Sequence, residues 1–455
     1  MPSLQICKEK EGPPIFFIHD MCHAIKLVRN AWHFHKCIKN SKSELIKWCY
    51  IEYLYQLQNT EHLKCANKLN ANHIYFNNVK MKVKFATQIF SRSVALSLKF
   101  CREELKLPQF QGSEATEEFL LIMNDIFDLM NSRTKYSNYK MRNALSGDNM
   151  QIWRSIFDKT QLYLTGLTTV SGKCLLEEDS RKTGFAAIFY NIVAISTIFS
   201  EIVTNGPMLY ICTYKFSQDP LEHFFGLIRS KFGSNNNPTP KQFRNVYKRI
   251  LLGVTNKLVQ NSNVILQDTT EMIAIIPSSE DKVDYIIDHY DFEDLELNDL
   301  TSGFRKNVTD YIGGFIVRKV SSKLTCEQCI KSLSSMPYSG LIKTKDIGGR
   351  MTYPSKFVQK ALQVAEEILQ AELNQNCYMK KYFFDFINMK ICNTFVSMFT
   401  ALFSGLDNHC YELLKKIIFC YCSIRFKSFA KEQNEILKKS KLRSKLNKIV
   451  LFSHQ

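Results

Sequence analysis

The sequence predicts an α-rich α/β fold, and three observations lead to this prediction. The run Ile15–Ile18 is short, continuous and apolar, which is typical of a buried strand. Apolar residues then recur every three or four positions through most of residues 41–210, as they do on amphipathic helices. Helical patterns return towards the C-terminus and end in the basic stretch Arg425–Lys448. A chain of 455 residues has room for two to four domains.

Composition restricts the class of protein. Hydrophobic residues make up 45% and charged residues 23% of the chain, which excludes a wholly disordered chain or a low-complexity fibre. Lys and Arg outnumber Asp and Glu by 60 to 43, so the formal net charge is +17. This excess favours polyanionic partners: nucleic acid first, and nucleotides or an anionic membrane surface second. The 15 cysteines and the charged, leaderless segment Met1–Gly12 predict free thiols in a reducing compartment.

The first elements are expected to be a strand and a helix. The strand Ile15–Ile18 leads into His19 and Asp20, and the pattern of His23–Trp32 predicts a helix with one apolar face. A carboxylate at the end of a buried strand is a common position for metal-assisted chemistry. Asp20 can equally be the N-cap of the following helix, and the residues alone favour the cap.

The next 170 residues are expected to be mainly helical. Apolar stripes predict helices at Trp48–Leu57, at Val79–Leu98 and at Phe119–Met130, the last with Thr116 as its N-cap. The most apolar segment is Phe185–Val203. Its polar residues would be costly in a bilayer, so a buried core helix is expected instead of a membrane span. They are Asn191, Ser196, Thr197 and Glu201.

A second group of acidic residues lies on the predicted helix Ser217–Arg229, where Asp219 and Glu222 stand three positions apart on one strip. The Gly- and Asn-rich run 233–238 should end this helix, and Thr239 followed by Pro240 should begin another. The stretch Ser278–Asp299 holds nine acidic residues and one lysine and predicts a solvated linker.

Metal and nucleotide motifs are scarce. The sequence contains no GxxxxGK[ST] phosphate loop, no GxGxxG and no HExxH. Cys326 and Cys329 form a CxxC pair, and His409 or the pair Cys420/Cys422 could complete a zinc site; buried free thiols are the alternative. Another set of potential ligands is scattered by helical spacing and is interpreted as ordinary residues. This set is His23, His33, His35 and Cys37.

Five segments occur in the order found in P-element-type DNA transposases and their THAP-domain relatives, and the chain resembles that family over Pro14–Gln455. The segments are IHDMCHAIKLVRN (18–30), KMKVKFATQIFSRSVA (80–95), FDLMNSR (127–133), SQDPLEHFFGLIRSKFGSNNNPTPKQF (217–243) and YIGGFIVRK (311–319). One such segment could arise by chance, but five in register are specific. The fourth segment is similar to the family's most specific block.

The resemblance implies a partial RNase H-like core interrupted by a large helical GTP-binding insertion, plus a helical C-terminal domain. The implied domains are the core (1–40), the insertion (41–210), closing helices of the core (211–260), an acidic linker (261–305) and the C-terminal domain (306–455). In this family carboxylates hold Mg²⁺ or Mn²⁺ for DNA cleavage and strand transfer. The second and third of these carboxylates match Asp20 and Glu222. The implied GTP contacts are Lys68, Lys82, Val83, Ser91, Phe127, Asp128, Asn131 and Asp219.

The chain also departs from the family pattern. No aspartate lies in Met1–Pro14, so the first catalytic acid is missing, as are the THAP zinc finger and the coiled-coil segment. The sequence therefore predicts a truncated or domesticated transposase in the nucleus that binds GTP, binds DNA mainly through non-specific phosphate contacts, and is catalytically impaired. A non-enzymatic nuclear DNA- or protein-binding factor is the alternative. No membrane contact is expected, and homo-oligomerisation and zinc binding stay open.

Overall fold

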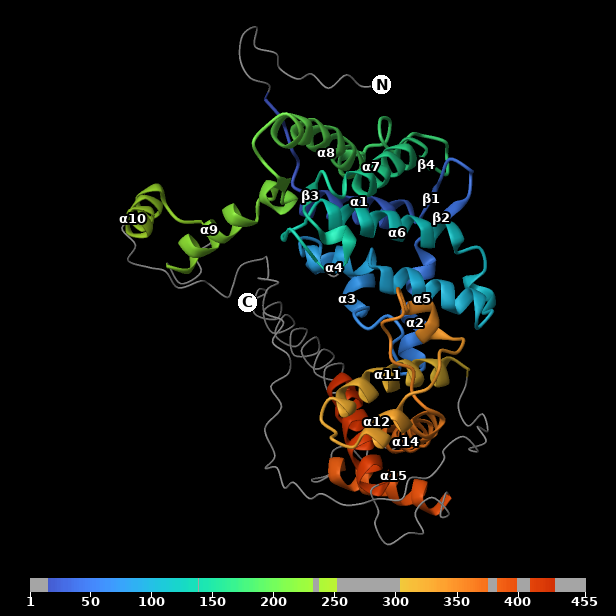
Figure 1. The fold of residues 1–455 in the computed structure, drawn as a ribbon. Helices are drawn as coiled ribbons and strands as arrows, with labels where there is room; N and C mark the ends of the chain where they lie inside the picture. Colours follow the sequence, from blue (N-terminus) through green and yellow to red (C-terminus); the bar gives the residue numbers. More distant parts are fainter. Residues whose placement is uncertain are drawn as a thin grey trace, which may run out of the picture. The chain divides into compact units, whose positions relative to one another are not determined.

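The structure, a computed structural model, describes six stretches of the chain: residues 15–137, 139–231, 237–251, 303–374, 383–398 and 410–429. The chain divides into two compact units, Met1–Ser278 and Ser279–Gln455 (Figure 1). The predicted acidic linker at 278–299 and most of the basic stretch 425–448 lie outside the described residues.

Unit 1 is built from helices. They are α1 (Met21–His35), α2 (Cys49–Thr60), α3 (Ala71–Ile74), α4 (Val83–Ile89), α5 (Arg92–Glu103), α6 (Glu114–Leu129), α7 (Met150–Thr165), α8 (Thr183–Phe199), α9 (Asp219–Ser230) and α10 (Pro240–Leu251). Short helical turns lie at Asn77–Val79, Pro108–Phe110, Lys140–Arg142, Ser200–Thr204 and Thr213–Phe216. This helix-rich architecture confirms the predicted fold class, and Pro240 begins α10 as expected.

Two small antiparallel sheets complete unit 1. The first has the order β2 (Leu45–Lys47), β1 (Cys37–Lys39) and β4 (Thr168–Thr169), and its central Ile38 pairs with Ile46 on one side and Thr169 on the other. The second pairs β3 (Leu145–Ser146) with β5 (Tyr210–Ile211). Both sheets join segments that are distant in the sequence, so they fasten the ends of the helical body together.

The core of unit 1 is centred on α1 and α8. Ile25, Val28 and Trp32 of α1 are fully buried, as the predicted apolar face requires. Gly184 allows close contact between the two helices, because a Cβ there would lie 2.7 Å from the Val28 backbone nitrogen. The segment Thr183–Thr204 is long and apolar enough to cross a membrane, but most residues of α8 itself are buried against protein. The predicted core helix is thus seen for Thr183–Phe199, whereas Ser200–Thr204 forms a separate helical turn that contains no buried residue.

Three local predictions were wrong. The residues 15–18 form no strand: Ile15 and Phe17 are exposed, and no described segment pairs with this run. A strand needs a hydrogen-bonded neighbour, which an apolar run by itself does not provide. The expected helix 79–98 is broken into α4 and α5, because the side chain of Ser91 accepts a hydrogen bond from the Val94 N–H and caps α5.

The third wrong prediction concerns the start of α6. This helix begins at Glu114, so Thr116 lies inside its first turn and does not cap it. The Thr116 hydroxyl instead accepts a hydrogen bond from the Lys47 N–H at 3.0 Å, which attaches β2 to α6. A threonine near a helix start can serve either its own helix or a neighbour, and the sequence does not distinguish these roles.

Unit 2 is a second helical body. It contains α11 (Gly303–Ser321), α12 (Glu327–Leu333), α13 (Leu341–Lys345), α14 (Lys356–Asn374), α15 (Phe383–Met398) and a further helix at 410–429. Its apolar core joins four of these helices through Ile316, Leu362, Phe395 and Ile417. The predicted C-terminal helical region is thus present in the part of the chain that the structure describes.

Candidate metal centre and nucleotide-binding residues

Asp20 is held in a fixed position at the start of α1. Its Oδ1 accepts a hydrogen bond from the Cys22 N–H at 2.9 Å, so the N-cap interpretation is confirmed. The preceding peptide is held by Asn191, a buried residue of α8. The Asn191 side-chain amide accepts from the His19 N–H and donates to the His19 carbonyl, both at 2.8 Å. The polar residue that argued against a membrane span thus anchors the backbone beside Asp20.

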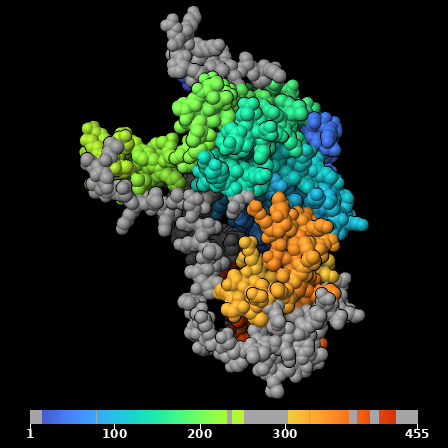
Figure 2. All heavy atoms as spheres, in the orientation of Figure 1, coloured from blue at the N-terminus to red at the C-terminus, as the bar shows by residue number. Residues whose placement is uncertain are grey.

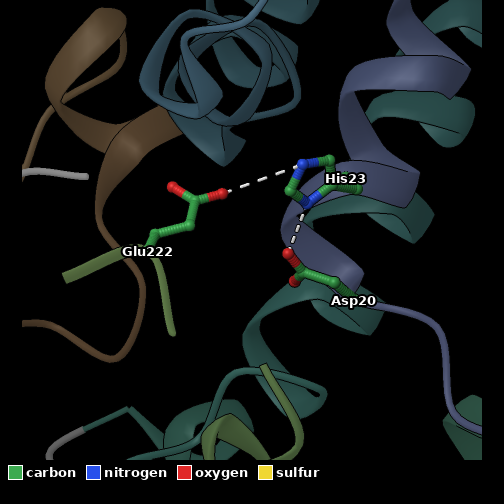
Figure 3. Close-up of side chains that lie close together, drawn as sticks. All are labelled: Asp20, His23 and Glu222. Atoms are coloured by element: carbon green, nitrogen blue, oxygen red, sulfur yellow. Dashed lines mark hydrogen bonds and ion pairs between the residues drawn. The ribbon is translucent and has the colours of Figure 1, made fainter. Parts of the chain in front are cut away.

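The second carboxylate oxygen of Asp20 contacts a side chain one helical turn away. Oδ2 contacts Nδ1 of His23, and Nε2 of the same ring lies 3.8 Å from Oε1 of Glu222 on α9 (Figure 3). The ligand atoms of Asp20, His23 and Glu222 all lie within 4.8 Å of one another. Asp20 is nearly buried, with 3% of its side chain exposed, whereas 37% of His23 and 33% of Glu222 are exposed. One face of the group is therefore open to solvent.

Charged and polar side chains surround this group. Lys26 lies buried on α1, and burial lowers its pKa although the carboxylates of Glu222 and Asp20 act against the shift. Asp219 of α9 pairs with Arg133 at 3.5 Å, and burial followed by the charge of Asp20 raises the pKa of its carboxyl. The Cys22 thiol has its pKa raised to about 12, first by burial and then by Asp20, so it stays protonated.

The structure therefore brings together the two predicted catalytic acids, Asp20 and Glu222, from distant parts of the sequence. It also adds His23, which the sequence analysis treated as an ordinary residue of a scattered histidine set. A signal for it was present, because a residue three positions after an N-cap points back over the cap. Among the residues that the structure describes, this is the group able to offer three ligands to one metal ion.

A hydrogen-bonded connection links the end of α6 to the segment before α9. The Ser132 N–H donates to the Thr213 hydroxyl at 3.0 Å, and the Tyr214 N–H donates to the Ser132 carbonyl at 3.2 Å. The Thr213 hydroxyl donates to the Leu129 carbonyl at 2.6 Å. The helix that carries Asp128 is thus fastened to the chain that leads into Asp219 and Glu222.

The predicted GTP contacts lie mostly on or beside α4, α5 and α6, and α6 packs on both of the other helices. Lys82 is exposed and precedes α4, Val83 is its first residue, and Ser91 caps α5. Phe127 and Asp128 are half-buried near the end of α6, and Asn131 follows it. Lys68 is exposed in the loop after α2. Asp219 lies in the first turn of α9, three positions before Glu222. No bound nucleotide tests these assignments, so they stay predictions.

Asp128 already has a partner. Its Oδ1 accepts a hydrogen bond from Nε of Arg142 at 3.2 Å, and the arginine side chain is 61% exposed. Burial raises the pKa of the Asp128 carboxyl, and the Arg142 charge opposes that shift. Arg142 is a long side chain that faces solvent, so it can move away from Asp128. The half-buried carboxylate can then accept a hydrogen bond from a ligand N–H in its place.

The cysteine pair in unit 2 leaves both predicted interpretations, a zinc site and buried free thiols, untested. Cys326 precedes α12 and Cys329 is buried within it, with its pKa raised to about 12 by burial and then by Cys326. His409 lies outside the described residues. Zinc binding by this pair therefore stays a prediction.

Three family models match the chain. They are a GTP-binding insertion domain of transposase-like proteins at residues 22–143, an RNase H C-terminal domain of the same proteins at 214–248, and the C-terminal domain of DNA transposase THAP9 at 299–431. The first begins inside α1 and the second contains Asp219 and Glu222. The GTP-binding insertion and the RNase H-like segment predicted from the sequence are thus both present.

Individual proteins agree with these models. The chain is 29% identical to the Transposable element P transposase of Drosophila melanogaster, over 80% of this chain and 47% of that protein. It is 25% identical to human DNA transposase THAP9, over 91% of this chain and 49% of that protein. The solved Drosophila P element transposase strand transfer complex is 28% identical, with a TM-score of 0.46, over 54% of this chain and 53% of that one. The chain spans about half the length of these curated relatives, and it belongs to the P-element-type, THAP-related family of DNA transposases.

Proposed function

We propose that this chain is a transposase-derived nuclear protein that binds DNA and GTP and keeps part of a metal-dependent strand-transfer centre. The observation that carries the proposal is the meeting of Asp20 and Glu222 at one imidazole, although they come from opposite ends of the helical insertion. Two carboxylates at this separation repel each other, and a bound cation would relieve that repulsion.

The chain's own side chains would divide the work as follows. A divalent ion bound here supplies Lewis-acid activation of a water or a 3′-hydroxyl. Asp20 keeps Oδ1 on the helix cap, and its Oδ2 would exchange the contact with His23 for the ion, while Glu222 would offer its carboxylate from the solvent-facing side. Asn191 fixes the backbone at His19, so the position of Asp20 does not depend on the ligand. The buried Lys26 offsets part of the acidic charge before any ion binds.

We further propose that the chain by itself does not cleave DNA. Strand transfer uses two metal ions that stabilise the attacking and the leaving oxygen. The carboxylates of Asp20 and Glu222 are too few to hold both ions in place. DNA binding has a separate basis. The net charge is +17, and α10, which lies at the surface of unit 1 (Figure 2), exposes four basic side chains. These residues are Lys241, Arg244, Lys248 and Arg249.

DNA binding can be tested by titrating the full chain into several unrelated duplexes across a salt series, with fluorescence anisotropy as the readout. Binding through phosphates should weaken with salt, with a slope of about −0.9 in log K against log salt for each phosphate neutralised. The affinities for the different duplexes should be similar. Salt-independent binding, or strong preference for one duplex, would contradict this part of the proposal.

Catalysis is tested on the same duplexes with Mg²⁺ or Mn²⁺ added. We expect no strand cleavage or joining by the wild-type chain. Metal-dependent strand transfer that disappears in Glu222→Ala would overturn the proposed inactivity and would show that a further ligand completes the centre. The Glu412→Ala variant is a suitable control, since Glu412 is an exposed helix residue of unit 2 that pairs with Lys415.

A further inference from the structure

Two segments of unit 1 that are distant in the sequence run side by side at the surface. The Cys212 thiol donates to the Arg133 carbonyl at 3.5 Å, and the Tyr214 N–H donates to the Ser132 carbonyl at 3.2 Å. The stretches 129–147 and 202–218 contain no Asp or Glu, and together they hold five Lys or Arg residues. Both stretches therefore contribute only positive charge to the surface that they form.

Tyrosine rings lie next to basic side chains on this surface. Nζ of Lys135 lies 5.1 Å from the ring centroid of Tyr136 and 5.5 Å from that of Tyr210. The guanidinium of Arg133 lies 5.3 Å from the ring centroid of Tyr214. Tyr136 is 72% exposed and Tyr210 is 39% exposed. We call these five residues the tyrosine strip, and its solvent-facing rings and cations suit a ligand with flat faces and negative charge.

We propose that the tyrosine strip binds single-stranded nucleic acid, with bases stacked on its rings and phosphates beside its basic side chains. A base can replace Lys135 at either ring, because a cation–π contact in solvent is weak, and the displaced ammonium can then meet a phosphate. A duplex cannot bind in this way, since its grooves present only the edges of its bases. The inference rests on the proposed DNA binding for the class of partner, and it adds the form of the strand and the residues.

The position of the strip relates it to the candidate metal centre. Arg133 pairs with Asp219 at 3.5 Å, and Asp219 lies three positions before Glu222 on α9. A single strand held on the strip would therefore have one end beside that centre. Of the strip residues, only Arg133 belongs to a segment shared with the transposase family, because the others lie between the segments 127–133 and 217–243. The strip is thus a separate observation from the family resemblance.

A plain anion-binding surface is the competing explanation. The positive charges would then attract any polyanion, and the tyrosine rings would only support them. The two explanations differ in the effect of Tyr136→Leu. Leucine keeps an apolar side chain and leaves every charge in place, but it removes the flat face on which a base can stack.

The experiment measures binding of the full chain to an oligothymidylate of about 15 nucleotides by fluorescence anisotropy, and to inorganic polyphosphate by competition. Tyr136→Leu and Tyr210→Leu should each weaken oligothymidylate binding by about fivefold or more and leave polyphosphate binding unchanged. Tyr75→Leu is the matched control, because Tyr75 is 71% exposed in the same unit and lies outside the strip, and it should bind as the wild type does. Circular dichroism would verify that all three variants fold.

Two further measurements complete the design. Lys135→Gln should lower the slope of log K against log salt by about 0.7, the value for one phosphate of a single strand. An oligouridylate of the same length shows whether RNA is held as well as DNA. A loss of binding in the tyrosine variants with either strand supports the inference.

The outcomes separate this inference from the function on which it rests. If the tyrosine variants bind both oligonucleotides as the wild type does, or lose polyphosphate binding to the same extent, the stacking role is wrong. The proposed DNA binding stands in that case, provided that duplexes still bind with the expected salt dependence. If the wild-type chain binds neither duplex nor single strand, both the strip and the proposed DNA binding are wrong.

Discussion

Two glutamates, one in each unit, lie beside basic side chains in contrasting environments. Glu366 on α14 has only 1% of its side chain exposed, and Arg425 donates to both of its carboxylate oxygens at 2.7 and 2.8 Å. The Tyr421 hydroxyl adds a third hydrogen bond at 2.5 Å. Glu222 on α9 is one-third exposed and its nearest basic atom, on His23, is 3.8 Å away. We call the group around Glu366 closed, because its carboxylate is buried and fully hydrogen-bonded, and the group around Glu222 open, because its carboxylate faces solvent.

The difference indicates which of the two groups serves the fold. A buried carboxylate needs a full set of donors, and Glu366 has them, so its bonds are used up in holding unit 2 together. The donors around Glu222 are too distant to satisfy it, and solvent or an ion must do so. The helices differ in the same way, since α14 is buried along most of its length whereas α9 buries only Asp219 and Ile228. In these two groups, the carboxylate with a complete set of short hydrogen bonds serves the fold, and the carboxylate without such bonds belongs to the candidate site.

The largest effect is expected from opening the closed group. Arg425→Met leaves the Glu366 carboxylate buried without its counter-charge, which should destabilise unit 2 by about 3–5 kcal/mol in urea unfolding. Lys415→Ala breaks an exposed ion pair with Glu412 in the same unit and should change the stability by less than about 0.5 kcal/mol. Equal losses of stability in the two variants would show that burial does not determine how much each of these ion pairs stabilises unit 2.

A second buried acid in unit 2 tests the comparison from the other side. Asp310 on α11 is 5% exposed, and its Oδ1 makes no hydrogen bond to any described residue. Burial raises the pKa of this carboxyl to about 7, against the opposing charge of Lys306. An acid whose pKa is raised on folding stabilises the fold below its unfolded pKa, near 4, and this contribution is lost as the pH rises towards 7.

Asp310→Asn should therefore stabilise unit 2 at pH 8, by up to about 4 kcal/mol for a shift of roughly three pH units. The difference between wild type and variant should shrink as the pH falls and vanish near pH 4. Thermal unfolding followed from pH 4 to pH 8 measures this directly. A variant that is destabilised at pH 8 would mean that Asp310 has a partner which only the ionised carboxylate can satisfy.

Several features could be predicted from the sequence because they depend on local patterns. The apolar face of α1, most of the core helix at 185–203, the N-cap at Asp20 and the Pro240 helix start each follow from neighbouring residues. The strand at 15–18 could not be judged in this way, because a strand depends on a partner elsewhere in the chain. The break between α4 and α5 had a readable signal in Ser91, which the continuous apolar stripe outweighed.

The site was predictable only in part. The pairing of Asp20 with Glu222 came from resemblance to a family, since no periodicity connects residues so far apart in the sequence. His23 was missed because it was considered together with His33 and His35 on its own helix. Its actual partners are the preceding cap residue and a glutamate on α9. Helical spacing describes contacts within one helix and does not reveal a ligand shared between two.

The smallest predicted effect concerns Asp128, which is intermediate between the open and closed groups. Its carboxylate is mostly buried, but its partner Arg142 is exposed, so a guanine base could replace that arginine with its own N1–H and N2–H donors. Asp128→Ala should weaken GTP binding by about 1–3 kcal/mol, since those donors would be left unpaired. Selectivity over ATP should fall with it, because adenine presents no N1–H. Glu118→Ala on the exposed face of the same helix is the control and should bind GTP as the wild type does. Titration calorimetry with both nucleotides measures these affinities. Equal affinities of the wild-type chain for GTP and ATP would show that Asp128 does not recognise guanine and that its ion pair with Arg142 serves only the fold.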